Sequence, residues 1–201
     1  DVLNAAKDAE TIIFVGGISP NLEKEQAKVV ASGFDNGDRT SIELPQVQRD
    51  ILKALHEAGK KIVFVNCSGS AVALTPETST CDAILQAWYP GEQGGHAVAD
   101  VLFGDYNPGG KLPITFYKDD SQLPPFDDYN MKGRTYRYFT GKPLYPFGYG
   151  LSYTTFKLRK PEYSDGKVRV EVKNTGNREG VEIVQVYLRN PADKEGPQRT
   201  L

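Results

Sequence analysis

The amino-acid sequence predicts an α/β fold, in which helices sandwich a mostly parallel sheet, followed by the first strands of an all-β sandwich. Two observations carry this prediction. Strand-like and helix-like segments alternate between residues 11 and 116, at lengths typical of right-handed crossovers between parallel strands. After residue 152 no helix-like pattern remains, and apolar and polar side chains alternate with a period of two, as in antiparallel strands.

The length and composition suit a soluble globular chain with a hydrophobic core. Of its 201 residues, 39% are hydrophobic and 25% are charged. The 24 Lys and Arg residues nearly balance the 26 Asp and Glu residues, which argues against a nucleic-acid-binding protein. No apolar run approaches the roughly 20 residues of a membrane span, and the first residues lack the pattern of a signal peptide. Two cysteines are too few for a disulfide scaffold.

The first expected elements are the end of a helix, a strand and a long loop. Residues 4–10 are typical of a helix end, and the apolar run 11–17 reads as a strand buried on both faces. Residues 18–44 are polar and rich in Gly, Asn and Asp, which is loop chemistry. Loops of this length in compact domains are usually functional or disordered.

A helix is expected to begin at Pro45, a position that suits proline. Val47, Ile51 and Leu55 recur every four residues and predict its buried face. Gly59 stands where a glycine commonly ends a helix.

Two further strands, a second helix and a final extended segment complete the predicted α/β part. The strands are expected at 61–67 and 82–88, and the helix at about 93–103. The segment 111–116 ends the series. The inner face of the second helix is expected to consist of Val98, Val101 and Leu102.

The C-terminal part is expected to contain two or three antiparallel strands. Residues 167–174 place three valines on one face and charged residues on the other, and residues 182–190 repeat this alternation. Such strands amount to half of a β-sandwich and could not bury a core alone. We therefore expect the chain to be a piece of a longer protein, with its second domain incomplete.

Metal and thiol chemistry are not indicated by the sequence. Neither His56 nor His96 has a second histidine or a cysteine at ligand spacing, so no metal site is expected. Cys67 and Cys81 are expected to be buried free thiols.

Two other common site patterns are also missing. The turn Ser68–Ser70 lacks the G-x-S-x-G spacing of a nucleophile elbow. The segment after Val15 lacks the glycine pattern of a phosphate-binding loop, which disfavours a nucleotide-binding domain. Cofactors are therefore not expected.

Carboxylates in the long loop remain as candidates for chemistry. Glu23 and Glu25 follow the first strand, and ligands of open α/β sheets bind at the carboxyl ends of the strands. A glutamate there can act as a general acid. A solvated acidic loop is the alternative. Asp38 and Arg39 are expected to form an ion pair that fixes the loop.

Several segments resemble glycoside hydrolase family 3, above all its β-xylosidase-like and β-glucosidase-like members. The most specific are WYPGEQGGHAVADVLFGDYNPGGKLP at 88–113 and PFGYGLSYTTF at 146–156, and the resemblance covers nearly the whole chain. It implies an enzyme of three parts: a barrel, an α/β sandwich with a six-stranded sheet, and a fibronectin type III-like domain of immunoglobulin-like architecture. Residues 1–150 would be the sandwich, without its N-terminal part, and 151–201 a partial fibronectin type III-like domain.

The resemblance also implies how the catalytic groups are divided. In this family the nucleophile is an Asp on the barrel, which this chain lacks, and the acid/base is often a Glu on a sandwich loop. Counting back from the Asp38–Arg39 pair favours Glu25, although residues 26–37 intervene in this sequence, and Glu23 is the alternative. The other family motifs, including Trp88–Gly91, Arg134 and Arg137, are expected to serve structure ahead of substrate contact.

The resulting hypothesis is a piece of an exo-acting retaining β-glycosidase, with β-xylosidase favoured, that removes terminal sugars from plant polysaccharide fragments. Its expected partners are a β-linked oligosaccharide and the barrel of the same protein, with no nucleic acid and no membrane span. Periplasmic or secreted location follows from the resemblance alone. A non-catalytic carbohydrate-binding or domain-packing module is the alternative.

Overall fold

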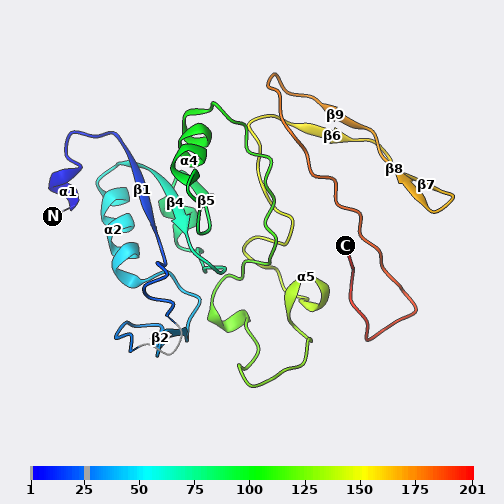
Figure 1. Ribbon diagram of the computed structural model, residues 1–201, viewed down its shortest axis with the longest axis horizontal. Coiled ribbons are helices and arrows are strands. Elements are labelled where there is room, and N and C mark those ends of the chain that lie inside the picture. Colours follow the sequence, from blue (N-terminus) through cyan, green and yellow to red (C-terminus); the bar gives the residue numbers. More distant parts are fainter. Residues whose placement is uncertain (1, 25–27) are drawn as a thin grey trace.

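The computed structural model describes residues 2–24 and 28–201 (Figure 1). The N-terminal part contains α1 (Val2–Ala5), β1 (Thr11–Gly17), β2 (Phe34–Asp35), β3 (Asp38–Arg39), α2 (Gln46–Glu57), β4 (Lys61–Cys67), α3 (Glu77–Thr80), β5 (Ala83–Gln86) and α4 (Gly94–Phe103). The C-terminal part contains η1 (Asp120–Gln122), α5 (Thr135–Tyr138), β6 (Phe156–Leu158), β7 (Glu162–Ser164), β8 (Lys167–Arg169) and β9 (Val172–Asn174). None of the described helices has the length and apolar character needed to cross a bilayer.

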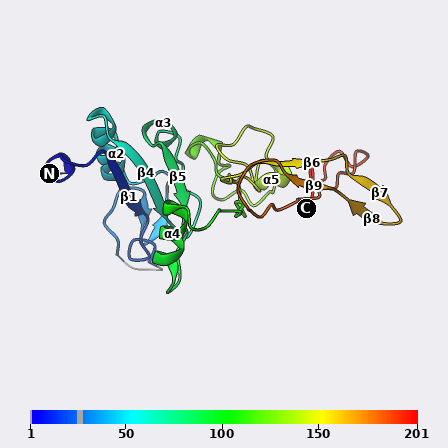
Figure 2. The same ribbon diagram turned by 90° about the horizontal axis from the view of Figure 1, so that it is seen from above.

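The parallel sheet is confirmed. In the described residues it has three strands in the order β1-β4-β5, and both pairings are parallel. The helices α2 and α4 flank this sheet (Figures 1 and 2). Because the strands are parallel, the loops after β1, β4 and β5 all leave the sheet at one edge.

The main core lies between one face of the sheet and α2. Ile62 and Phe64 of β4 are fully buried there, against Leu52 and Leu55 of α2. The Phe14 ring of β1 packs on Phe64 with 5.7 Å between ring centroids. This apolar contact holds the crossover between β1 and β4 in place.

The predicted buried face of α2 is partly wrong. Val47 is 65% exposed, whereas Leu55 is buried and Ile51 is half-buried. Residues four apart on an α-helix are rotated by about 40° relative to each other, so two such steps carry Val47 away from the core. The buried stripe shifts to Leu52 instead.

The expected burial of residues 11–17 on both faces is also wrong. Ile13 is 46% exposed and Val15 is 65% exposed. Their strand, β1, lies at the edge of the three-stranded sheet, and successive side chains of a strand point to opposite faces. The central strand β4 does fit the prediction, because Val65 on its second face is buried as well.

The end of α2 forms as predicted. The amide of Gly59 donates to the carbonyl of His56 at 2.8 Å, and the amide of Lys60 donates to the carbonyl of Leu55 at 3.1 Å. These two bonds define a Schellman ending, with Gly59 just outside the helix.

Two expected extended segments form isolated bridges rather than strands. In 111–116 only Phe116 bridges Tyr145, and Pro113 has no amide with which to continue a ladder. In 182–190 only Leu188 forms a bridge, with Thr200. A strand needs a neighbouring strand along its whole length. In the described residues each of these two segments has a bridge partner at one position only.

The antiparallel character of the C-terminal part is confirmed, but 167–174 is not one strand. Its first half, β8, pairs with β7, and its second half, β9, pairs with β6. The chain changes partners between Arg169 and Val172, so neither pair becomes longer than three residues. Val168 and Val172 are about 40% exposed as a result.

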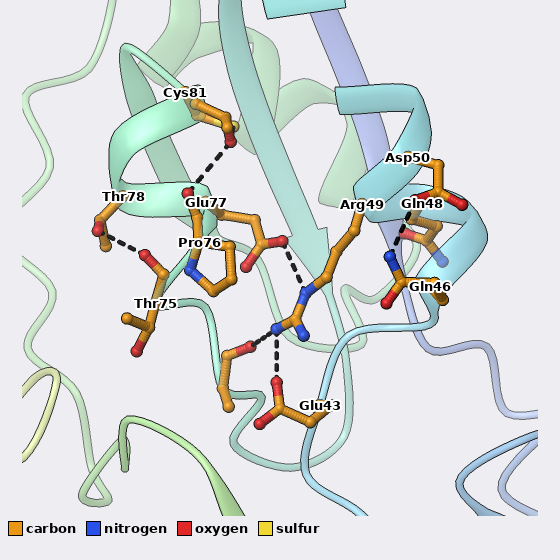
Figure 3. Close-up of polar contacts among 12 residues, drawn as sticks. Glu43, Gln46, Gln48, Arg49, Asp50, Thr75, Pro76, Glu77, Thr78 and Cys81 are labelled. Carbon is orange, nitrogen blue, oxygen red and sulfur yellow. Dashed lines mark hydrogen bonds and ion pairs between the residues drawn. The ribbon is translucent and has the colours of Figure 1, made fainter. Parts of the chain in front are cut away.

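A buried ion network connects α2 with α3 and with the loop before α2 (Figure 3). The Nε of Arg49 lies 3.0 Å from Oε1 of Glu77, whose side chain is 1% exposed. The Nη2 of Arg49 lies 2.6 Å from Oε2 of Glu43 and donates to the carbonyl of Ala73 at 2.8 Å. One guanidinium therefore compensates two carboxylates from separate segments.

We expect Arg49→Met to destabilise the fold strongly, because it leaves the Glu77 carboxylate buried without a partner. Removing one member of a buried pair typically costs about 3–5 kcal/mol. The matched control is Lys53→Met on the same helix, which breaks a pair with Glu57 whose side chains are 68% and 64% exposed. That change is expected to cost less than about 0.5 kcal/mol. Equal losses in urea unfolding would contradict the buried network.

Candidate functional site

Three loops meet at the carboxyl edge of the parallel sheet. Glu23 follows β1, Ser70 follows β4, and Tyr89 follows β5. Ligands of open α/β sheets bind in the crevice outside the carboxyl ends of the strands, which is this edge. In Figure 1 the loop that contains β2 lies at this same end of the sheet.

The carboxylate of Glu23 accepts hydrogen bonds from the other two loops. The hydroxyl of Tyr89 donates to its Oε2 at 2.6 Å, and the hydroxyl of Ser70 donates to its Oε1 at 3.2 Å. Glu23 itself is half-buried. The sequence-predicted carboxylate is therefore held at the edge through both of its oxygens.

Arg39 stands behind this carboxylate. Its Nη1 donates to Ser70 Oγ at 3.0 Å and to the carbonyl of Ala71 at 3.2 Å. Burial lowers the pKa of the Arg39 guanidinium, and the nearby charge of Glu23 opposes that shift. Arg39 thus orients Ser70 and supplies positive charge to the cluster.

The predicted ion pair between Asp38 and Arg39 is wrong. Both residues belong to the short strand β3, and neighbouring side chains of a strand point to opposite faces. Arg39 points inward to Ser70, and Asp38 is exposed.

Tyr89 is the member of this cluster that sequence reasoning missed, because the motif Trp88–Gly91 is expected to serve structure. Burial and the hydrogen bond to Glu23 raise the pKa of Tyr89 to about 12. These surroundings favour the protonated phenol, which is the form that donates the hydrogen bond to Glu23. Its position directly after β5, at the carboxyl edge, is the signal that could have revealed it.

Gly69 makes room for the Tyr89 ring. A Cβ placed on Gly69 would lie 2.6 Å from the ring carbon Cε2 of Tyr89, which is closer than real contacts allow. Any side chain at this position would displace the ring from Glu23.

A tight hairpin supports the loop that carries Glu23. Asn36 and Gly37 connect β2 with β3 at φ values of 51° and 93°, as in a type I′ turn. A Cβ on Gly37 would come within 1.4 Å of the carbonyl oxygen of Lys24. Backbone contact at Lys24 thus fixes the residue that follows Glu23.

Glu25, the favoured acid/base of the sequence analysis, lies outside the described residues. The structure therefore gives a position for Glu23 and for Lys24, and none for Glu25.

The floor of the site is a buried polar network. Asn66 Nδ2 donates to Gln86 Oε1 at 2.6 Å, and Gln86 Nε2 donates to Ser68 Oγ at 3.1 Å. Ser68 Oγ donates to the carbonyl of Ser70 at 2.8 Å. Both serine hydroxyls of the Ser68–Ser70 turn are engaged in such contacts, which gives them a structural role.

Metal-ligating side chains do not cluster in the described part of the chain. Cys67 and Cys81 are free thiols and are half-buried rather than buried. Burial raises the pKa of Cys67, and it raises the pKa of Cys81 to about 11. Neither thiol is activated as a nucleophile.

A family model described as the glycosyl hydrolase family 3 C-terminal domain matches residues 1–153. The chain belongs to glycosyl hydrolase family 3. The residues of the Glu23 cluster all fall within the matched range.

Curated relatives agree with the family 3 assignment. A protein of Xylanibacter ruminicola named xylan 1,4-beta-xylosidase is 60% identical over 97% of this chain and 23% of its own length. A Salmonella typhimurium protein named periplasmic beta-glucosidase is 43% identical over 94% of this chain and 26% of its own length. The chain thus spans about a quarter of the length of these relatives.

Solved structures of two glycosidases share the fold. A beta-glucosidase from Kluyveromyces marxianus superposes with a TM-score of 0.81 at 33% identity, covering 98% of this chain and 25% of that one. A family 3 exo-beta-xylosidase bound to a xylobiose aziridine probe gives a TM-score of 0.75 at 30% identity, covering 98% of this chain and 29% of that one.

We expect the Tyr89–Glu23 contact to appear as a pH dependence of stability. The pKa of Tyr89 rises from 10.0 to about 12 on folding, so the folded protein keeps a proton that the unfolded chain loses in this window. The free energy of unfolding should therefore fall more steeply with pH above 10 in the wild-type protein than in Tyr89→Phe. Urea unfolding across this window measures it. Equal slopes would contradict the contact, and below about pH 9 the slopes should coincide.

Proposed function

We propose that this chain is part of an exo-acting retaining β-glycosidase that removes terminal β-linked sugars, xylose in the first place, from plant polysaccharide fragments. The observation that carries the proposal is the Glu23 carboxylate, held at the open edge of the sheet by donors from two other loops. A positioned carboxyl group at such an edge is what a general acid requires. The 60% identical relative named xylan 1,4-beta-xylosidase supports xylose as the sugar.

In this proposal the chain supplies one of two catalytic carboxyl groups. Retaining glycosidases place them about 5–5.5 Å apart. An Asp on the barrel domain of the same protein attacks the anomeric carbon, while the glutamate of this chain protonates the departing oxygen. The resulting carboxylate then takes a proton from water, which attacks the anomeric carbon and releases the Asp. The β configuration is thereby retained.

The acid/base is one of the two glutamates in the loop after β1. Glu25 is favoured by its place before the Asp38–Arg39 pair. Glu23 is supported by its contacts with Tyr89 and Ser70, which fix the carboxylate direction. If Glu25 is the acid, the Glu23 contacts hold the loop that presents it.

A periplasmic or secreted location is part of the proposal. It is supported by the name of the 43% identical relative, periplasmic beta-glucosidase.

We expect Glu25→Gln in the full-length enzyme to slow hydrolysis of xylobiose by about 10²–10⁴-fold and that of dinitrophenyl β-xyloside far less, because a good leaving group needs little protonation. Glu23→Gln is the matched variant, two residues away in the same loop. The kcat/KM for each substrate measures both. If Glu23→Gln alone gives this pattern, Glu23 is the acid/base; if neither does, the loop carries no catalytic acid.

The 201-residue chain by itself is expected to leave aryl β-xylosides intact, because the proposed nucleophile is on another domain. Release of nitrophenol by the purified chain at a rate near that of the full-length enzyme would contradict the division of carboxyl groups. Addition of the chain to the separately expressed barrel provides the positive control.

A further inference from the structure

A second candidate site lies away from the Glu23 cluster. A cavity of about 640 Å³ opens between the α5 region and the C-terminal segment. Its volume falls in the range of about 300–1,000 Å³ that is typical of small-molecule sites. None of the residues that hold Glu23 lines it.

Aromatic rings form the walls of this cavity. Tyr136 stacks on Phe147 with 4.3 Å between ring centroids, and Tyr187 meets Tyr136 edge-on at 5.9 Å. All three rings are half-buried and line the cavity. Rings that pack against each other are held in fixed positions and present apolar faces. The C–H groups on one face of a sugar can pack against such a face.

The polar lining is positively charged. Arg189 and Arg199 line the cavity, and among its described lining residues there is no Asp or Glu. Arg199 lies over the Tyr187 ring at 5.0 Å. In the described part of the chain neither arginine takes part in an ion pair. Guanidinium groups bind carboxylates through paired hydrogen bonds, so the cavity fits an anionic ligand.

The frame of the cavity is preformed. Leu188 and Thr200 exchange two backbone hydrogen bonds of 2.8 Å, which places Arg189 and Arg199 on neighbouring strand-like segments. The amide of Gln198 donates to the carbonyl of Arg137 at 2.7 Å, tying this segment to α5. Figure 1 shows the C-terminus beside α5.

We propose that this cavity binds a uronic acid residue of an oligosaccharide, with the sugar ring against Tyr136 and Tyr187 and the carboxylate on Arg189 and Arg199. The inference goes beyond the proposed hydrolytic function and does not require it. It concerns a second carbohydrate site, which would keep acidic fragments near the enzyme without cleaving them.

Titration calorimetry of the full-length protein tests the site. The probes are xylotriose bearing one glucuronic acid, unsubstituted xylotriose and acetate. We expect the acidic oligosaccharide to bind, and Arg199→Gln to weaken it about tenfold through loss of the charge-assisted bonds. The matched control is Arg178→Gln, since Arg178 lies over the Tyr153 ring at 5.3 Å and outside the cavity.

Four results would overturn the proposal: no binding, equal binding of neutral xylotriose, equal binding of acetate, or equal effects of Arg199→Gln and Arg178→Gln. Glu23→Gln and Glu25→Gln should leave the affinity unchanged, as should prior treatment with xylobiose aziridine. If those variants lose hydrolysis and keep binding, the two sites are separate. If calorimetry fails while hydrolysis persists, only the second site is refuted.

Discussion

Parallel pairing of β1, β4 and β5 is the constraint on which the rest of the site depends. It brings the starts of three loops, which are far apart in the chain, to one edge of the sheet. The hydroxyls of Ser70 and Tyr89 can therefore both donate to the carboxylate of Glu23. The apolar contact between α2 and β4 holds the strands in this order. Arg49 then fixes the loop before α2 by compensating Glu43 and Glu77 together.

The site is held by hydrogen bonds that converge on one ionisable group. Arg39 bonds to Ser70, Ser70 bonds to Glu23, and Tyr89 bonds to the other oxygen of Glu23. Each member is oriented by the next, so removing one leaves a partly buried polar group unpaired. Two glycines make this arrangement possible because they have no side chain. The Tyr89 ring occupies the space next to Gly69, and the Lys24 backbone occupies the space next to Gly37.

The C-terminal part is organised differently. Its antiparallel pairs are three residues long and leave valines about 40% exposed, so its order rests on aromatic contacts with the α5 region. The same rings that join the two segments also line the cationic cavity. Packing and ligand binding would thus share one set of side chains there.

Local patterns in the sequence determined the type and place of most elements. The predicted structure forms in 11–17, 46–57 and 61–67. The signals that predict it are the hydrophobic period of each segment and, for the helix, Pro45 and Gly59, and all of them lie within or next to the segment they define. The sequence also predicted that the loop after the first strand carries the candidate carboxylates Glu23 and Glu25. Only the tertiary structure decided which face of β1 is exposed and that Tyr89 donates to Glu23. It also decided that, among the described residues, the segment 182–190 forms a single bridge and not a strand. These depend on neighbours distant in the chain, and a residue's own pattern carries no record of what packs against it.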